Sequence, residues 1–281
     1  MTMFECDSAT TAARIELLQD YMSKNVFGAD GFVCASADAC RQSVLVDPQG
    51  RRRGDRSFSE GQLSHVGHHY DLIQDGLPLR ILVVAMETGR EHVGVTLADR
   101  RLQLAQSASL PFSSRNPHMR GTTSVLRASI GRSPSDDRVG ELIELPTEPE
   151  PVHLFDCYAM ANIRLCSATL AGTSTSKGTA VMSRNCLRHL AATIEILEPT
   201  VVIVQGIPVA KDLDTLVTTR ERIVPELRMA TICGVDVALA CFTHPSAKSL
   251  NQHWGRLTSA DYLWDTVVPT MSLARANLGF R

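Results

Sequence analysis

The stretch RILVVAM, residues 80–86, follows its arginine with six apolar side chains in a row. A short continuous apolar run of this kind is typical of a strand that is buried on both faces of a sheet. Comparable runs occur in VHLFDCYAMAN at residues 152–162, TVVIVQG at 200–206, RMATIC at 228–233 and VDVALACF at 235–242. Helical patterns separate several of them, and the clearest covers residues 182–197 before Pro199. The order of elements predicts an α/β three-layer sandwich, with a central, mostly parallel sheet flanked by helices.

Two segments of different character divide the chain at the first of these runs. Residues 1–79 hold a predicted helix at 13–25 and then a weakly periodic, irregular extension over 28–79. A long irregular segment inside a compact protein is usually functional or bound to a cofactor. Residues 80–281 hold the predicted α/β core. We expect both segments to form one compact domain.

Composition limits the partners of the chain. The net charge of −2 makes it no bulk polycation, so nucleic-acid binding requires a local basic patch. The run RRRGDR at residues 51–56 is either such a phosphate contact or ordinary solvated surface. No apolar stretch is long enough for a membrane helix, and the first residues lack the order of a signal peptide. We expect a cytoplasmic monomer with no membrane contact.

Cysteine is more frequent than packing requires. The chain has 8 cysteines, and disulfides are rare in the cytoplasm, so some of these thiols are candidates for binding a metal or an iron–sulfur cluster. Buried cysteines that act only as small apolar residues are the alternative for the rest.

Polar or small residues follow the predicted strands. Glu87 comes after the first strand, Asn162 ends the second, Gly206 follows the third, and His244 with Pro245 follows the last. Ligands of open α/β sheets bind beside the carboxyl ends of the strands, so these residues are expected at one rim. An amide suits the edge of a base, a carboxylate can position water, and a histidine can donate to a developing anion. This set suits cleavage of an N-glycosidic bond.

The ordered motifs of the chain resemble the uracil-DNA glycosylase superfamily over residues 80–276. AMETG at residues 85–89 is similar to the first motif of that family, which reads GQDPY, GEAPG or GMNPG, and HPSA at 244–247 is similar to the second. NIRLC at 162–166 resembles the NVVKC of the iron–sulfur branch, and LEPTVVIVQG at 197–206 resembles its strand before a helix.

The resemblance implies a [4Fe–4S] cofactor held by four thiolates. Cys166 closes the NIRLC motif, and Cys186 stands near the start of a predicted helix. Cys34 and Cys40 would complete the set, although the family usually has a tighter pair near its N-terminus.

The same resemblance implies the catalytic and base-binding residues. Glu87 and His244 take the catalytic positions, with Glu87 where relatives carry Asp or Asn and Thr88 where they carry proline. The base-binding positions fall on Met86, Gly89, Phe112, His118 and Asn162. Gly89 replaces the tyrosine that rejects 5-substituted bases in strict uracil enzymes, and His118 or Phe112 would stack on a flipped base.

Contacts to DNA are implied for Arg120, Ser246, Lys248 and Arg256. Trp254, in the loop after the second motif, is either a wedge that enters the duplex or a core residue.

The sequence therefore predicts a monofunctional DNA glycosylase that excises uracil or a 5-modified pyrimidine from DNA, in repair or in defence against phages with hydroxymethylated or glucosylated bases. Two alternatives stay open. One is a catalytically weak protein that binds modified bases or abasic sites. The other is a metal-dependent hydrolase built on His65, His68 and His69.

Overall fold

The computed structural model describes residues 3–89, 93–173, 175–249, 252–257 and 260–280. Its centre is a sheet of seven strands in the order β14-β15-β16-β13-β8-β11-β5. These strands are β5 (His65–Val66), β8 (Ile81–Ala85), β11 (Ala159–Asn162), β13 (Val201–Gln205), β14 (Val217–Val224), β15 (Leu227–Ile232) and β16 (Val235–Phe242). None of the helices in the described ranges is both long and apolar enough to cross a membrane.

The four central strands are parallel, and the added strands at both edges are antiparallel. β8 pairs in parallel with β11 on one side and with β13 on the other, and β13 pairs in parallel with β16. β5 extends the β11 edge, while β15 and β14 extend the β16 edge, each antiparallel to its neighbour. The sheet is thus mixed rather than mostly parallel. The strand β14 follows the short helix α6 (Ile207–Leu213) and a 3-10 turn at Asp214–Leu216.

Side chains of the central strands alternate between two apolar cores. Val83 of β8 and Ile203 of β13 belong to the core on one face, and Leu82 of β8 and Val202 of β13 belong to the other. Because both faces are covered, every residue of β8 and of β13 is buried. This is why these strands read as continuous apolar runs rather than as alternating ones.

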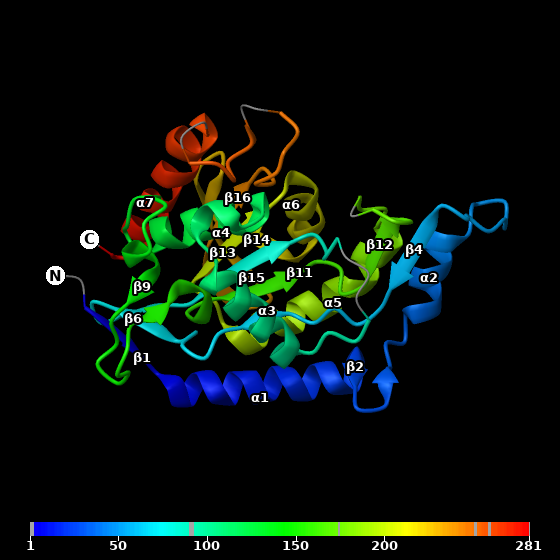
Figure 1. The fold of residues 1–281 in the computed structure, drawn as a ribbon, viewed down its shortest axis with the longest axis horizontal. Coiled ribbons are helices and arrows are strands. Elements are labelled where there is room, and N and C mark those ends of the chain that lie inside the picture. Colours follow the sequence, from blue (N-terminus) through cyan, green and yellow to red (C-terminus); the bar gives the residue numbers. More distant parts are fainter. Residues whose placement is uncertain (1–2, 90–92, 174, 250–251, 258–259, 281) are drawn as a thin grey trace.

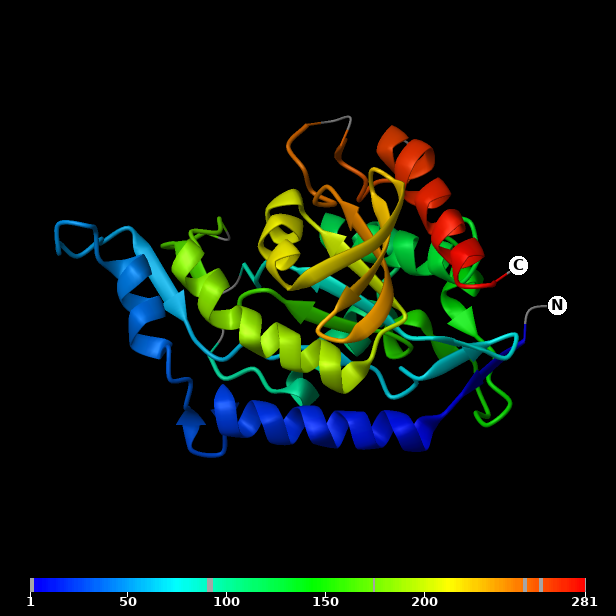
Figure 2. The same ribbon diagram turned by 180° about the vertical axis from the view of Figure 1, so that it is seen from behind.

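Helices cover both faces of the sheet (Figures 1 and 2). One core is closed by α4 (Pro117–Ser129), α7 (Val268–Asn277) and the preceding turn Leu263–Val267, together with the second half of α3 (Leu97–Ser109). The other is closed by α1 (Ser8–Asn25), α5 (Ala180–Leu197) and α6. The structure is therefore mixed α/β, with a large sheet between two layers of helices.

The segment expected to be irregular, residues 28–79, contains regular elements. It holds α2 (Ala37–Leu45), one strand of the main sheet and the short strands β3 (Gly31–Phe32), β4 (Arg56–Ser59), β6 (Leu72–Gln74) and β7 (Leu77–Leu79). β6 pairs with β1 (Phe4–Cys6) and β7, while β3 pairs with β2 (Phe27–Gly28). β4 pairs with β12 (Ser167–Leu170), and with α2 these strands form an arm that projects from the sheet (Figures 1 and 2). We call α2, β4 and β12 the arm.

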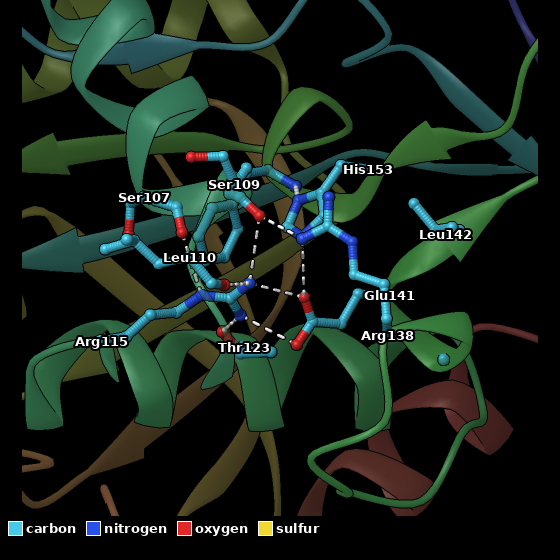
Figure 3. Close-up of polar contacts among 12 residues, drawn as sticks. Ser107, Ser109, Leu110, Arg115, Thr123, Arg138, Glu141, Leu142 and His153 are labelled. Carbon is cyan, nitrogen blue, oxygen red and sulfur yellow. Dashed lines mark hydrogen bonds and ion pairs between the residues drawn. The ribbon is translucent and has the colours of Figure 1, made fainter. Parts of the chain in front are cut away.

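A buried ion pair fixes the approach to α4 (Figure 3). The guanidinium of Arg115 donates to both carboxylate oxygens of Glu141 at 2.9 and 2.7 Å, and His153 Nε2 lies 2.8 Å from the same carboxylate. The side chains of Arg115 and Glu141 are 0% and 1% exposed. Hydrogen bonds from Arg115 and His153, together with the charge of Arg115, hold the pKa of Glu141 below its ordinary value, although burial opposes this. The pair ties the turn before α4 to β9 (Leu142–Ile143) and β10 (Val152–His153).

Replacement of Arg115 by methionine should cost about 3–5 kcal/mol of unfolding free energy, because it leaves the Glu141 carboxylate buried without its main partner. Urea unfolding measures this change. The matched control is Arg220→Met, which removes an exposed ion pair with Asp236 and should cost about 0–1 kcal/mol. Equal losses in the two variants would show that the buried pair adds no special stability.

Candidate functional site

Four parallel strands end at one edge of the sheet, and their last residues place the candidate site. The strand order at this edge is β11, β8, β13, β16, so the ends carry Asn162, the segment Met86–Gly89, Gln205 and His244 in that order. After β8, the chain first forms β11 on one side of it and later forms β13 on its other side. The crevice at such a switch in direction is where ligands of open α/β sheets bind.

Asn162 and Thr88 meet across the first two strands. The pairing of β11 with β8 continues one residue past the end of β11, since Ile163 N donates to Ala85 O at 2.8 Å. This brings Asn162 Nδ2 to 3.4 Å from Thr88 Oγ1, and Asn162 is 7% exposed. The Thr88 backbone carbonyl also accepts a hydrogen bond from the Ser167 hydroxyl at the start of the arm. The expected base-reading amide is therefore held at the rim by a hydroxyl that the family motif does not carry.

Glu87 lies on the arm side of this rim and is paired. Arg164 Nη1 donates to Glu87 Oε2 at 3.0 Å, and the Ser176 hydroxyl donates to Oε1. The Glu87 side chain is only 1% exposed, and this burial raises the pKa of its carboxyl although Arg164 opposes the shift. A Cβ on Gly178 would lie 1.4 Å from Arg164 Nη1, so only glycine lets the loop before α5 close over the pair.

His244 and His118 lie together at the other end of the rim. Their rings are stacked, with centroids 5.6 Å apart and planes at 20°. Ser246 N donates to His244 Nδ1 at 3.1 Å, so the neutral ring carries its proton on Nε2. Burial, helped by the neighbouring His253, lowers the pKa of His244 and keeps the ring neutral at physiological pH. Burial also lowers the pKa of His118 to about 3.

Close packing between α4 and the turn after β16 brings these two histidines together. Asn116 caps α4 by accepting from Met119 N, and Pro117 and His118 follow in the first turn. A Cβ on Gly121 would lie 2.6 Å from Pro245 Cβ. Trp254 is fully buried against this contact and donates from Nε1 to Thr243 O at 2.8 Å. Of the two roles considered for Trp254, the structure therefore shows core packing.

The remaining predicted contacts are spread around this rim. Ser246, Lys248 and Arg256 are exposed on the segment after β16, while Arg120 is partly buried on α4. Phe112 is 6% exposed in a short 3-10 turn, so His118 rather than Phe112 lies beside His244. Met86 is packed against the core on the α5 face. Gly89 is the last described residue before the gap at 90–92.

The four predicted cysteine ligands share one neighbourhood at the base of the arm. Cys34 precedes α2, Cys40 lies in α2, Cys166 precedes β12, and Cys186 lies in α5. Burial raises the pKa of the thiols of Cys40, Cys166 and Cys186, and the charges of the other cysteines in the set raise it further. N–H donors face three of the sulfurs: Asn185 Nδ2 lies 3.4 Å from Cys40 Sγ, and the backbones of Gly61 and Leu165 donate to Cys166 and Cys186.

The donor chemistry of these residues, four thiols with N–H donors facing three of them, fits an iron–sulfur cofactor. Among the described residues, no three His, Cys, Asp or Glu side chains converge closely enough to hold a single metal ion. In a [4Fe–4S] cluster each thiolate binds a different iron, so the sulfurs stand apart around a group several ångströms wide. Four cysteines and facing N–H donors fit that arrangement. Cys6, Cys157, Cys233 and Cys241 lie elsewhere in the fold and have no place in the set.

Of the histidines at residues 65–69, His68 and His69 share Asp156 as a partner, while His65 faces a backbone carbonyl. His65 is buried, with Nε2 2.7 Å from Phe155 O. His69 lies between Asp156 and Glu148, at 2.9 and 3.1 Å, and its hydrogen bond to Asp156 raises its pKa. His68 is largely exposed and contacts Arg101. This arrangement is a network of ion pairs and hydrogen bonds, and it gives no support to a hydrolase built on these three residues.

Several residues at the rim were not predicted from the sequence. Gln205 ends β13, is fully buried and binds Thr122 Oγ1 at 3.1 Å. The rule that strand ends carry the site would have found Gln205, one residue before the expected Gly206. No comparable sequence signal marks Arg164, Ser176 or His253, because their positions depend on how distant segments pack. The chain matches no known protein-family model and no curated protein sequence.

Replacement of Gly121 by alanine should move Pro245 and separate the His118–His244 stack. Overpacking costs about 1–3 kcal/mol, and the helix preference for alanine returns at most about 1 kcal/mol, so the variant should be less stable. Thermal unfolding measures the loss, and histidine ring NMR shifts report the stack. Gly54→Ala, which meets no atom within 4 Å, is the control and should change neither. Unaltered ring shifts in Gly121→Ala would contradict the assigned packing.

Proposed function

We propose that this protein is a DNA glycosylase of the uracil-DNA glycosylase superfamily, in its iron–sulfur branch, which excises uracil or a 5-modified pyrimidine. The observation that carries the proposal is the rim itself. An amide, a carboxylate and a neutral, proton-donating imidazole follow the ends of three of the four parallel strands. These are the groups that breaking an N-glycosidic bond requires. The exposed Ser246, Lys248 and Arg256 beside this rim suit contacts to DNA phosphates.

His244 has the protonation state that the reaction needs. When the C1′–N1 bond breaks, its electron pair goes to the base, and negative charge develops on the base oxygens. A neutral ring that donates from Nε2 can stabilise this charge without a full proton transfer, and the Ser246 N–H at Nδ1 fixes that tautomer. The oxygen of a water molecule then bonds to C1′, and the proton released from that water restores the neutral base.

Asn162 and Glu87 divide the remaining tasks. Asn162 keeps an amide oxygen and one N–H for the edge of the base, since Thr88 takes the other N–H. Glu87 supplies negative charge near the sugar cation and orients the attacking water, which requires that its carboxylate exchange the Ser176 hydroxyl for water. Cys34, Cys40, Cys166 and Cys186 would hold a [4Fe–4S] cluster that joins α2, α5 and the start of β12.

One observation favours a second candidate, a modified-base or abasic-site binding protein with little catalysis. Both oxygens of Glu87 are hydrogen-bonded, and its side chain is buried. If the Glu87 carboxylate kept its hydrogen bonds to Arg164 and Ser176, it would stabilise the fold. The water that attacks C1′ would then have no carboxylate to orient it.

Base release distinguishes the two candidates. Oligonucleotides that each hold one pyrimidine, namely uracil or the 5-hydroxymethyl or glucosylated cytosine of phage DNA, are incubated with the protein and cleaved by alkali at abasic sites. We expect release by the native chain and at least a hundredfold slower release by His244→Ala and Glu87→Gln, within the range of single catalytic groups. Arg164→Gln breaks the same ion pair from its other side and serves as the matched control.

Two results would count against the assignment. Equal loss of stability and unaltered release in Glu87→Gln and Arg164→Gln would make Glu87 a structural residue. Binding without release of any base by the native chain would favour the second candidate.

The cluster has its own test. Aerobically or anaerobically purified protein should be brown and contain iron and sulfide, and Cys166→Ser or Cys186→Ser should remove the visible absorption. Cys241→Ser and Cys233→Ser are the controls and should keep it, since both cysteines lie on the far part of the sheet, in and beside β15 and β16. A colourless protein that binds zinc would overturn the cluster proposal while leaving the base-release test untouched.

A further inference from the structure

A buried arginine lies directly behind the candidate site and forms no ion pair with a carboxylate of the described residues. Arg100 belongs to the first turn of α3 and is 5% exposed. Its guanidinium donates to Leu63 O at 3.2 Å, to Gln103 Oε1 at 2.7 Å, to Gln62 Oε1 at 3.0 Å and to Thr88 Oγ1 at 3.2 Å. All four acceptors are neutral. In the described parts of the chain no carboxylate lies within ion-pair distance of Arg100. Three of the other four buried arginines, Arg115, Arg127 and Arg164, each have one, and the fourth, Arg275, donates to Gln74 Oε1 and Ser129 O.

Asp99 is the carboxylate in the described parts of the chain whose charge acts on Arg100, and it forms no ion pair with Arg100. Asp99, the next residue, is exposed and bonds the backbone and hydroxyl of Thr96 in the capping box of α3. Tyr158 is the other ionisable group that acts on Arg100, and burial raises its pKa, so it remains a neutral phenol. A buried charge without a partner is costly, and a fold retains one where an anion is bound or formed.

The path from Arg100 to the site is short. Its Nη2 bonds Thr88 Oγ1, which also accepts from Asn162 Nδ2 at 3.4 Å. The charge therefore stands two hydrogen bonds behind the amide expected to face the base. Thr88 is one of the positions at which the chain departs from the family motif, and a proline there would offer Arg100 no hydroxyl.

We propose that Arg100 provides the positive charge that balances the pyrimidine anion formed at this rim, acting through Thr88 and Asn162 without touching the base. Arg100 is thus a positioning residue, and the inference rests on the proposed function. The electron pair of the broken C1′–N1 bond stays on the base, where the field of Arg100 lowers its energy. The poorer the base is as a leaving group, the more the reaction depends on this field.

The test compares Arg100→Met, which keeps the length and removes the charge, with Arg100→Lys, which keeps the charge. The matched control is Arg101→Met, on the same helix, whose side chain binds Val66 O and His68 away from the rim. Release rates are measured for a series of 5-substituted uracils of different N1 acidity. We expect Arg100→Met to slow the least acidic base most, so that the dependence of rate on acidity steepens, while Arg100→Lys restores most of the native slope.

A second readout does not depend on turnover. Free 5-fluorouracil is titrated into each variant across the pH range in which its N1–H ionises. The native chain should bind the anion, and Arg100→Met should bind it about 10- to 100-fold more weakly, as expected for the loss of one nearby charge in a partly buried site. Thermal unfolding confirms that each variant is folded, and Arg100→Lys remains the informative variant if Arg100→Met does not fold.

The outcomes separate the inference from the proposed function. If Arg100→Met slowed the release of all bases equally, or if Arg101→Met slowed release by the same factor, the role of Arg100 would be overturned even if the native chain is a glycosylase. If the native chain releases no base, the proposed function fails, and binding of 5-fluorouracil alone decides on Arg100. Preference for the 5-fluorouracil anion in the native chain, lost in Arg100→Met, supports the inference. A native chain that shows no such preference overturns it.

Discussion

The parallel pairing of β8 with both β11 and β13 is the constraint on which the rest of the structure depends. Because the chain passes from β8 to β11 on one side and later to β13 on the other, the carboxyl end of β8 stands at the point where the sheet topology switches direction. Residues 86–89 leave β8 at this point, and Ile163 and Arg164 extend the β11 pairing beside them. The pairing register of β8 with β11 therefore sets where residues 86–89 and Arg164 lie at the rim.

Three packed contacts convert this edge of the sheet into a candidate site. The Arg164–Glu87 pair, closed over by Gly178, ties the rim to the base of the arm. The approach of Pro245 to Gly121 brings His244 against His118. The buried Arg115–Glu141 pair holds the turn that leads into α4 (Figure 3). Glu87 and His244 lie at opposite ends of the rim and share no hydrogen bond in the described parts of the chain. Only a bound ligand would connect them.

The charges at the rim follow a consistent order. Cationic Arg164 neutralises Glu87 on the arm side, and neutral imidazoles occupy the β16 side. Arg100, which has no ion pair among the described residues, lies behind the middle. An anionic product is favoured by such a field, and a cationic ligand is not. This electrostatic pattern is the one that the chemistry proposed for the site would use, and Arg100 lies outside every motif of the sequence.

The sequence by itself determined the buried strands and their order, because a strand covered on both faces must be apolar at every position. It also placed Glu87, Asn162 and His244, since the ends of parallel strands necessarily share one edge. It could not determine the outermost strand β14, since this half-exposed strand carries no continuous apolar run. Nor could it determine that Glu87 is paired with Arg164, or that Arg100 forms no ion pair in the described ranges. Those facts depend on contacts between segments far apart in the chain, such as Arg164 with Glu87 and α3 with Thr88, and only the tertiary structure decides which side chains meet.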